Sequence, residues 1–386
     1  MRRAGLRGTL RAVTLGVAMS VATVASAQVA KHLAPIPAAT AALIAAKGTT
    51  AAAPVLMRVF KKEAELEVWK LARDGRYALL KTFPICRWSG QLGPKMRVGD
   101  RQAPEGFYAI APRQMNPNSA YYLSFDTGFP NAYDKAHGAT GSALMVHGTC
   151  SSMGCFAMTD AQVGEIFALA REAFAGGQGA IPFHAFPFRL TAQNMARHRT
   201  EQHIGFWRML KEGYDRFEAT GEEPSVSVAG GRYVFGPSRN PGREALARTR
   251  IEEESKRTEE LVAAGIAAVR TTYSDGGTHP TFASLAMMSS PALGMVSRPE
   301  ALAFAGREIT VIPARKAPPL PPVLVAGLRP EVVTAPLATE SLSGLVFASL
   351  GYGSATSPTA AAPAIPGSVR ILGQELGGAA FQLAVR

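Results

Sequence analysis

Apolar and polar residues alternate in short runs over much of the chain, which is typical of strands. One pair of runs flanks Asp74-Gly75, a dipeptide that strongly favours a hairpin turn. A later run contains Pro182 and Pro187, so we expect an edge or bulged strand there. Extended segments are predicted at residues 55–60, 65–72, 77–83, 106–110, 121–125, 143–146, 180–188 and 226–235.

Three longer segments have helical spacing or composition. Thr159 and Gln162 form a capping box that predicts a helix over residues 160–175. A second helix is predicted over residues 201–218; its aromatic stripe is typical of a core or docking surface rather than a cofactor site. Residues 243–270 are strongly charged and predict a third helix. The combination predicts a mainly β fold with flanking helices, of the α+β class.

The two ends of the chain differ in composition from its middle. Residues 1–27 have the arginines, apolar stretch and small-residue cleavage site of a signal peptide. Residues 28–53 are alanine-rich with few charges and predict a linker or a marginal helix. We expect the folded domain at residues 54–235. Residues 236–386 combine the basic helix with a low-complexity tail rich in Pro, Ala, Ser and Gly.

The composition fits one folded domain with appendages. A chain of 386 residues with 47% hydrophobic content can bury one core. After the leader no stretch approaches the roughly 18 apolar residues of a membrane span, so we expect no transmembrane span in the mature chain and a location in the periplasm. The net charge of +12 suits a polyanionic partner such as the cell wall or an anionic membrane. No nucleic-acid-binding module accompanies this charge, so nucleic acid is not an expected partner.

Three cysteines leave an odd thiol in an oxidising compartment. If Cys86 pairs with Cys150, Cys155 stays free to react. A bridge between Cys150 and Cys155 would instead silence Cys155 or make it sensitive to redox conditions. The sequence leaves both pairings open.

Residues 147–155 place an imidazole and a thiol in one glycine-bearing segment. A thiol with a pKa of roughly 8.5 is mostly protonated at neutral pH, so a catalytic cysteine needs a base within reach. His147 ends an apolar run, and the helix start after Cys155 offers N–H groups that favour an anion. Two other interpretations stay open. One is an inert, buried cysteine; the other is a zinc site of His147, Cys150 and Cys155, although no paired C-x-x-C completes a tetrahedral set.

Several separated motifs occur in order along the chain. His147-Gly148 is followed by Ser152-x-Gly154-Cys155. The supporting blocks are Pro84-Ile85-Cys86-Arg87, Gly93-Pro94-Lys95, Gly99-Asp100-Arg101, Pro104-Glu105-Gly106-Phe107-Tyr108, Pro130-Asn131-Ala132-Tyr133-Asp134 and Phe186-Pro187-Phe188-Arg189. Over about residues 54–235 this order resembles the L,D-transpeptidase catalytic domains of the YkuD type, and most of all their YafK-like subgroup. The resemblance implies a YkuD-like β-sandwich of mixed sheets, here followed by a loosely ordered C-terminal extension.

The resemblance also implies a cysteine acyltransferase without a metal or cofactor. It assigns Cys155 as the nucleophile, His147 as its base and the backbone carbonyl of Gly148 as the group that orients the imidazole. Backbone N–H groups around Gly154 and Cys155 would hold the oxyanion. Ser152 would bond either the loop or the substrate.

The implied substrate is a peptidoglycan stem peptide. In such enzymes the cysteine attacks the carbonyl between the third, diamino acid residue and a following D-amino acid, and the resulting thioester passes to an amine. The reaction cross-links or remodels the wall or attaches a protein to it, so stem peptides are the expected partners and a wall-attached protein is a second candidate. The alternatives are a hydrolase on the same scaffold, an amidase or carboxypeptidase that releases wall-linked protein or trims stems, and a non-catalytic wall-binding module.

Four further side chains are candidates for substrate binding. Arg87, Lys95 and Arg101 offer cations for a stem carboxylate, with solvated surface charge as the other interpretation. Tyr108 lines the donor groove or packs in the core. Two departures from the family pattern affect the acceptor side: the loop before the nucleophile is shorter than in many members, and Ala157 stands where a basic residue is often found.

Overall fold

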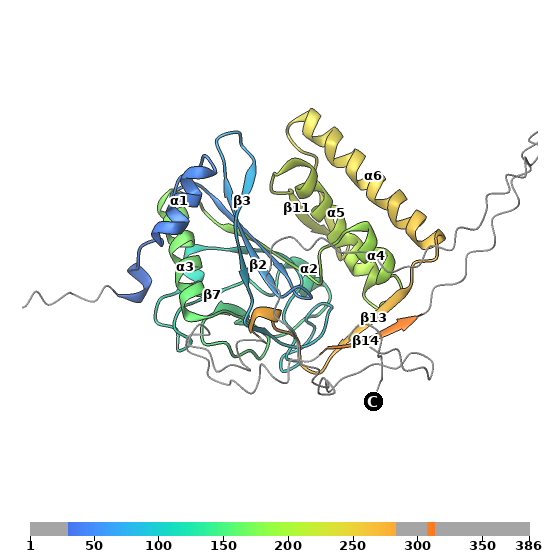
Figure 1. Cartoon of the computed structure of the whole chain (residues 1–386), viewed down its shortest axis with the longest axis horizontal. Coiled ribbons are helices and arrows are strands. Elements are labelled where there is room, and N and C mark those ends of the chain that lie inside the picture. Colours follow the sequence, from blue (N-terminus) through green and yellow to red (C-terminus); the bar gives the residue numbers. More distant parts are fainter. Residues whose placement is uncertain (1–29, 283–306, 313–386) are drawn as a thin grey trace, which may run out of the picture.

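The computed structural model describes residues 30–282 and 307–312, in which two five-stranded sheets are flanked by helices (Figure 1). The α+β class with mixed sheets is confirmed. The predicted signal peptide and most of the predicted C-terminal tail lie outside the described residues. Within the described part, no helix combines the length and the apolar character needed to cross a membrane.

The first sheet begins with the meander that the hydrophobic pattern predicts. β1 (Val55–Phe60), β2 (Glu65–Leu71) and β3 (Tyr77–Pro84) are antiparallel neighbours, and β10 (Ile181–Phe186) and β5 (Gly106–Ile110) complete the order β3-β2-β1-β10-β5. The edge position expected from Pro182 is wrong, because β10 lies between β1 and β5. This proline is tolerated inside the sheet because the parallel pairing with β1 begins only at Phe183.

The second sheet carries residues 147–155, the segment that contains the imidazole and the thiol. Its order is β4 (Arg87–Trp88), β9 (Phe156–Ala157), β8 (Met145–His147), β7 (Ser124–Asp126) and β6 (Met115–Asn116). β8 and β9 are parallel, and the other neighbours are antiparallel. Trp88, Phe156, Val146 and Phe125 are cross-strand partners and are fully buried on one face. Phe156 reaches Phe183 of the first sheet with ring centroids 6.0 Å apart, so this face closes the core between the sheets.

Helix α3 (Asp160–Ala175) packs against strands of both sheets. The predicted capping box between Thr159 and Gln162 begins it. The alanine-rich segment before β1 docks on the same helix: it contains η1 (Lys31–Leu33) and α1 (Ala38–Ala46), and Arg171 donates to the carbonyl of His32 at 2.6 Å. Of the two interpretations of residues 28–53, a helix is therefore present for α1, and tertiary contacts hold it.

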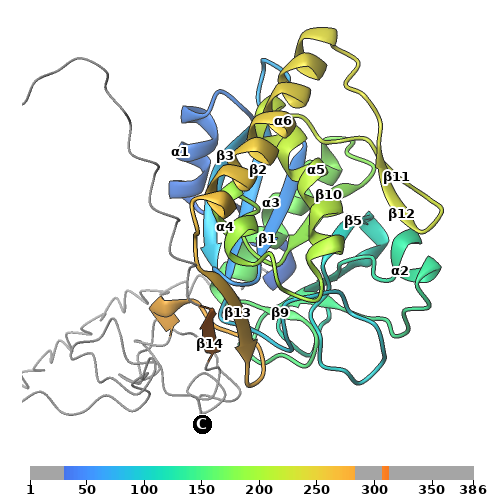
Figure 2. The same cartoon turned by 90° about the vertical axis from the view of Figure 1, so that its right-hand side faces the viewer.

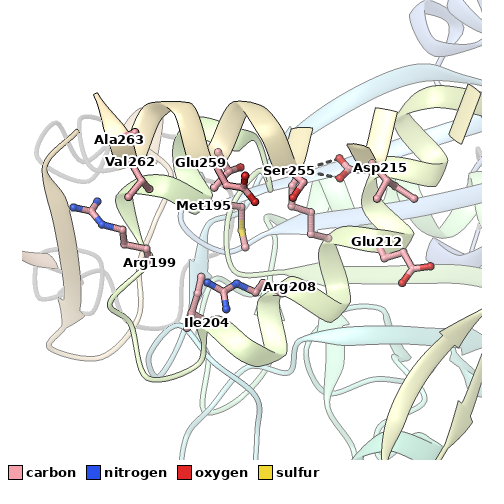
Figure 3. Close-up of a pocket in the computed structure, with 13 residues that line it drawn as sticks. Met195, Arg199, Ile204, Arg208, Glu212, Asp215, Ser255, Glu259, Val262 and Ala263 are labelled. Atoms are coloured by element: carbon pink, nitrogen blue, oxygen red, sulfur yellow. Dashed lines mark hydrogen bonds and ion pairs between the residues drawn. The ribbon is translucent and has the colours of Figure 1, made fainter. Parts of the chain in front are cut away.

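A layer of three helices covers the first sheet, as Figure 2 shows. They are α4 (Ala192–Arg197), α5 (Ile204–Thr220) and α6 (Pro241–Ala263). On α5, Phe217 meets Trp69 of β2 edge to face, with centroids 5.0 Å apart. Ion pairs from Lys211 to Glu254 and from Arg216 to Glu244, both 3.0 Å, tie α6 to α5. A cavity of about 720 Å³ lies between these helices (Figure 3).

The described part of the C-terminal extension is attached to the domain. The helix expected over residues 243–270 ends at Ala263, and β13 (Ala268–Tyr273) pairs with β14 (Arg307–Ile312). Residues 271–282 were expected to be loosely ordered, but backbone hydrogen bonds join residues 277 and 279 to the β4 region. The remaining elements are η2 (Pro112–Gln114), α2 (Ala132–Ala136) and the hairpin β11 (Val226–Ala229) and β12 (Arg232–Phe235), where one strand was expected.

A disulfide joins Cys86, just before β4, to Cys150 in the loop between β8 and β9. The Cα atoms are 5.3 Å apart, and the bridge spans 64 residues of sequence. Cys155 is the free cysteine. Of the two pairings that the sequence left open, the structure has the one that leaves Cys155 able to react.

We predict that the unreduced, unfolded protein takes up one alkylating group, on Cys155, whereas the reduced protein takes up three. Replacing Cys86 and Cys150 by alanine should lower the free energy of unfolding by about 4 kcal/mol, the chain-entropy value for a loop of this length. Intact-mass spectrometry and urea unfolding measure the two quantities, and Cys155→Ser is the control that keeps the bridge. An unreduced protein that is alkylated on Cys150 would contradict the pairing.

Candidate active site

Strand register places Cys155 and His147 on one face of the second sheet. His147 pairs with Ala157, whereas the neighbouring pair, Val146 and Phe156, faces the buried core. Because side chains alternate along a strand, His147 and Ala157 face away from that core. Cys155 precedes Ala157 by two residues and shares its face. Its Sγ atom accepts a hydrogen bond from the backbone N–H of Met145 at 3.4 Å, so the thiol lies beside the strand that carries His147.

The imidazole of His147 is held in one tautomer. Its Nδ1 atom lies 2.6 Å from the carbonyl oxygen of Gly148, and a carbonyl only accepts, so Nδ1 carries the proton and Nε2 keeps a lone pair. The ring of Tyr121 covers the imidazole, with centroids 4.7 Å apart. Burial lowers the pKa of His147, against the opposing effect of the Gly148 carbonyl. The imidazole is therefore neutral and able to take a proton at neutral pH.

Gly148 is needed because its backbone is crowded. A Cβ atom there would lie 2.5 Å from Asp160 Oδ1 and 2.9 Å from the carbonyl oxygen of Tyr121. The same carboxylate oxygen accepts from the backbone N–H of Thr149 at 2.9 Å. The start of α3 thus fixes the residues that directly follow His147. The hydrogen bond that the family resemblance implies for the Gly148 carbonyl is present.

The half-buried thiol of Cys155 has four electrostatic influences. Burial raises its pKa most, the hydrogen bond from the Met145 N–H lowers it, the charge of Asp126 raises it and that of Lys95 lowers it. The net effect is a raised pKa. With a protonated thiol and a neutral imidazole on one sheet face, the proton moves when the sulfur attacks, because no stable thiolate exists beforehand.

Two serine hydroxyls accept hydrogen bonds from the backbone N–H groups of Gly154 and Cys155, which the family resemblance implies as the oxyanion donors. Ser152 Oγ accepts from the N–H of Cys155 at 3.0 Å and donates to the Cys155 carbonyl at 2.7 Å. Ser89 Oγ accepts from the N–H of Gly154 at 2.6 Å. Of the two roles expected for Ser152, the structure has the bond to the loop. Gly154 and Cys155 can donate to an oxyanion only if these hydroxyls turn away.

The four candidate substrate-binding side chains have partners within the protein. Arg87 and Arg101 both contact Asp275, and Lys95 pairs with Asp100 and donates to the carbonyl of Arg97. Tyr108 is buried, and its hydroxyl donates to the carbonyl of Glu105 at 3.0 Å. Tyr108 therefore packs in the core and does not line the donor groove.

Sequence reasoning missed Ser89, Tyr121 and Asp126. Ser89 and Asp126 lie on or beside strands β4 and β7, in the same cross-strand row as Cys155 and Met145. Tyr121 lies in the loop before β7 and contacts His147 only in the folded chain. No local motif marks any of the three residues, because the register of four strands brings Ser89 and Asp126 to the site and a loop brings Tyr121.

The zinc interpretation is wrong for this structure. Cys150 forms a disulfide with Cys86, so its sulfur is not a thiolate ligand. Over residues 30–282 no group of three or more His, Cys, Asp or Glu side chains is placed to hold a metal ion. The cavity in Figure 3 is a separate feature, since its lining comes from the helical layer and includes Met195, Ile251 and Val262.

Two curated relatives share about half of this chain. The L,D-transpeptidase-family protein YafK of Escherichia coli (strain K12) is 46% identical over 181 residues, which are 47% of this chain and 73% of that protein. YafK of Escherichia coli O157:H7 matches to the same extent. Both names assign a family without an established reaction. No protein-family profile matches the chain.

Solved structures give weaker likenesses. The helical cell shape determining protein Pgp2 of Campylobacter jejuni is 16% identical with a TM-score of 0.28, over 61% of this chain and 80% of that chain. Bd1075 of Bdellovibrio bacteriovorus is 17% identical with a TM-score of 0.26, over 58% of this chain and 75% of that chain. Likenesses of this size carry no functional argument.

We predict that Asp126→Asn lowers the pKa of the Cys155 thiol, since it removes a negative charge that disfavours the thiolate. The rate of alkylation by iodoacetamide, measured against pH, reports this pKa. The rise in rate should therefore begin at lower pH in the variant. Asp74→Asn, in an exposed turn, is the matched control and should leave the profile unchanged. An unchanged profile for Asp126→Asn would show that its carboxylate does not act on the thiol.

Proposed function

Because the chain belongs to the L,D-transpeptidase family, we propose that it is a periplasmic cysteine acyltransferase that acts on peptidoglycan stem peptides. The observation that carries the proposal is that Cys155 is a free thiol and that His147 is held in the tautomer that leaves Nε2 basic. A free thiol shares a sheet face with an imidazole whose Nδ1–H is bound to a backbone carbonyl, so that Nε2 is the basic atom. A carbonyl takes the place that a carboxylate has in many triads.

In the first half of the reaction the thiol is acylated. His147 Nε2 takes the proton of Cys155 as the sulfur attacks the carbonyl that follows the diamino acid residue of the stem. As the Ser89 and Ser152 hydroxyls turn away, the backbone N–H groups of Gly154 and Cys155 become free to stabilise the tetrahedral oxyanion, with a contribution of about 3 kcal/mol per donor in comparable sites. The imidazolium returns the proton to the leaving amine of the D-amino acid, which departs and leaves a thioester on Cys155.

In the second half an acceptor takes the acyl group. His147 removes a proton from an incoming amine, the amine attacks the thioester, and the thiol is regenerated. Water in place of the amine gives hydrolysis by the same steps, so the acceptor alone separates a transpeptidase from an amidase or carboxypeptidase. An amine carried by another stem gives a cross-link, and one carried by a protein gives attachment.

The proposed location has support from the chain and from its chemistry. The leader has the composition of a signal peptide, although residues 1–27 lie outside the described part. The Cys86–Cys150 bridge fits an oxidising compartment, because disulfides persist there and are rare in the cytosol. The net charge of +12 suits an anionic wall.

We predict that the protein converts a disaccharide tetrapeptide and forms a mass adduct on Cys155. Cys155→Ser and His147→Gln should each lower turnover by about a thousandfold or more, since each removes one half of the nucleophile–base pair. The adduct should be absent in the first variant. His137→Gln is the matched control, because His137 is an exposed histidine at the end of α2.

Product analysis by chromatography and mass spectrometry assigns the acceptor. Dimers or exchanged D-amino acids support transfer, whereas tripeptides alone make the protein a hydrolase. If Cys155→Ser leaves both turnover and wall binding unchanged, the protein is a non-catalytic wall-binding module and the proposal is wrong.

A further inference from the structure

Residues 273–279, called the strap below, run along the free edge of β4. Trp88 and Gly277 exchange two backbone hydrogen bonds of 3.0 and 3.1 Å, and the N–H of His279 donates to the carbonyl of Ile85 at 3.0 Å. The hydroxyl of Thr278 donates to the carbonyl of Cys86 at 2.7 Å. The strap is therefore joined to the edge of the second sheet by one antiparallel bridge between Trp88 and Gly277.

Two glycines allow the strap to lie this close. A Cβ atom at Gly276 would be 2.0 Å from the carbonyl oxygen of Trp88, and Gly276 has a φ of +74°. A Cβ atom at Gly277 would be 2.9 Å from Nε1 of the Trp88 indole. This close fit brings the preceding residue, Asp275, to the end of β4.

Asp275 lies between two arginines, called the arginine clamp below. Its carboxylate contacts Arg87 Nη2 at 3.0 Å and Arg101 through both Nε and Nη2, and it accepts from the backbone N–H of Gly90 at 3.2 Å. Arg87 is only 4% exposed. Its Nη1 atom is also buried and has no hydrogen-bond acceptor among the residues that the structure describes. A buried guanidinium with an unused donor is costly unless a further acceptor binds it.

The arginine clamp belongs to the face that carries the thiol. Arg87 pairs with Ala157, and Ala157 pairs with His147, so these three side chains form one cross-strand row. Ala157 contributes only a methyl group between the guanidinium and the imidazole. One carboxylate also leaves the two arginines with an excess positive charge. The sheet face that carries Cys155 thus also carries a positively charged site that can bind an anion.

We propose that Arg87 and Arg101 form a carboxylate subsite for the stem peptide, and that Asp275 occupies this subsite until a substrate carboxylate replaces it. The inference rests on the proposed function, because it names the group of the stem peptide that the face recognises. Two arginine forks match the planar, bidentate geometry of a carboxylate, and a stem tetrapeptide carries a carboxylate at its C-terminus. Asp275 can leave because its side chain is partly solvent-exposed, as is that of Arg101.

The test measures peptide binding apart from turnover. In a full-length Cys155→Ser background, calorimetry compares a stem tetrapeptide with free carboxylates and the same peptide with those carboxylates amidated. Adding Asp275→Asn should strengthen binding of the free peptide about fivefold, since it removes the competing charge. Adding Arg101→Gln should weaken it about tenfold, since it removes a charge-assisted contact. Neither change should alter binding of the amidated peptide.

Controls separate the subsite from structural and charge effects. Arg208→Gln makes the same charge change on the exposed surface of α5 and should leave binding unchanged. Thermal melting checks that each variant is folded. If Asp275→Asn lowers the melting temperature and leaves affinity for the free peptide unchanged or weaker, Asp275 only fastens the strap and the inference is overturned. The inference is also overturned if the Cys155→Ser protein, without a further change, does not bind the free peptide.

The two proposals fail in different ways. If binding responds as expected but the chain with Cys155 forms no acyl-enzyme, the carboxylate subsite stands and the proposed reaction does not. If the protein converts the tetrapeptide but neither Asp275→Asn nor Arg101→Gln changes its affinity for the peptide, the proposed reaction stands and the subsite does not.

Discussion

The site depends on an unusually short connection between two parallel strands. β8 ends at His147 and β9 begins at Phe156, so residues 148–155 alone join parallel neighbours that normally need a crossover of about a dozen residues or more. The tight path requires positive φ angles at Thr149 and Cys150, each costing about 1–2 kcal/mol for a residue with a side chain. The disulfide, the Asp160 carboxylate and two serine hydroxyls offset that cost. The same shortness brings a base and a thiol onto one sheet face.

Burial sets the chemistry of this pair. It raises the pKa of the thiol and lowers that of the imidazole, so both groups are uncharged at rest. A neutral pair avoids the energetic cost of two isolated charges on a partly desolvated face, and the charges form only as a substrate arrives. The hydrogen bond from Nδ1 to a backbone carbonyl keeps the histidine oriented without adding a negative charge near the developing oxyanion.

Local sequence predicted those parts of the site that are close along the chain. Cys155, His147 and Gly148 share one nine-residue segment, and hydrophobic periodicity located most of the strands and the helix α3. Asp126 and Ser89 could not be predicted, because only cross-strand register brings them near the thiol. Asp275 is 188 residues from Arg87 and lies in a segment whose composition is typical of disorder. The helix α1 has weak amphipathic periodicity and is held by tertiary contacts that no propensity encodes.

The strap also determines when the second sheet is complete. During synthesis β4 emerges long before residues 273–279, and until they dock its outer edge presents unpaired peptide groups. An open strand edge is a template for pairing with other chains, and the strap covers the backbone groups of Trp88 at this edge. A chain shortened before residue 273 would keep Cys155 but expose the edge of β4. The solubility of the protein therefore depends on a segment outside the catalytic motif.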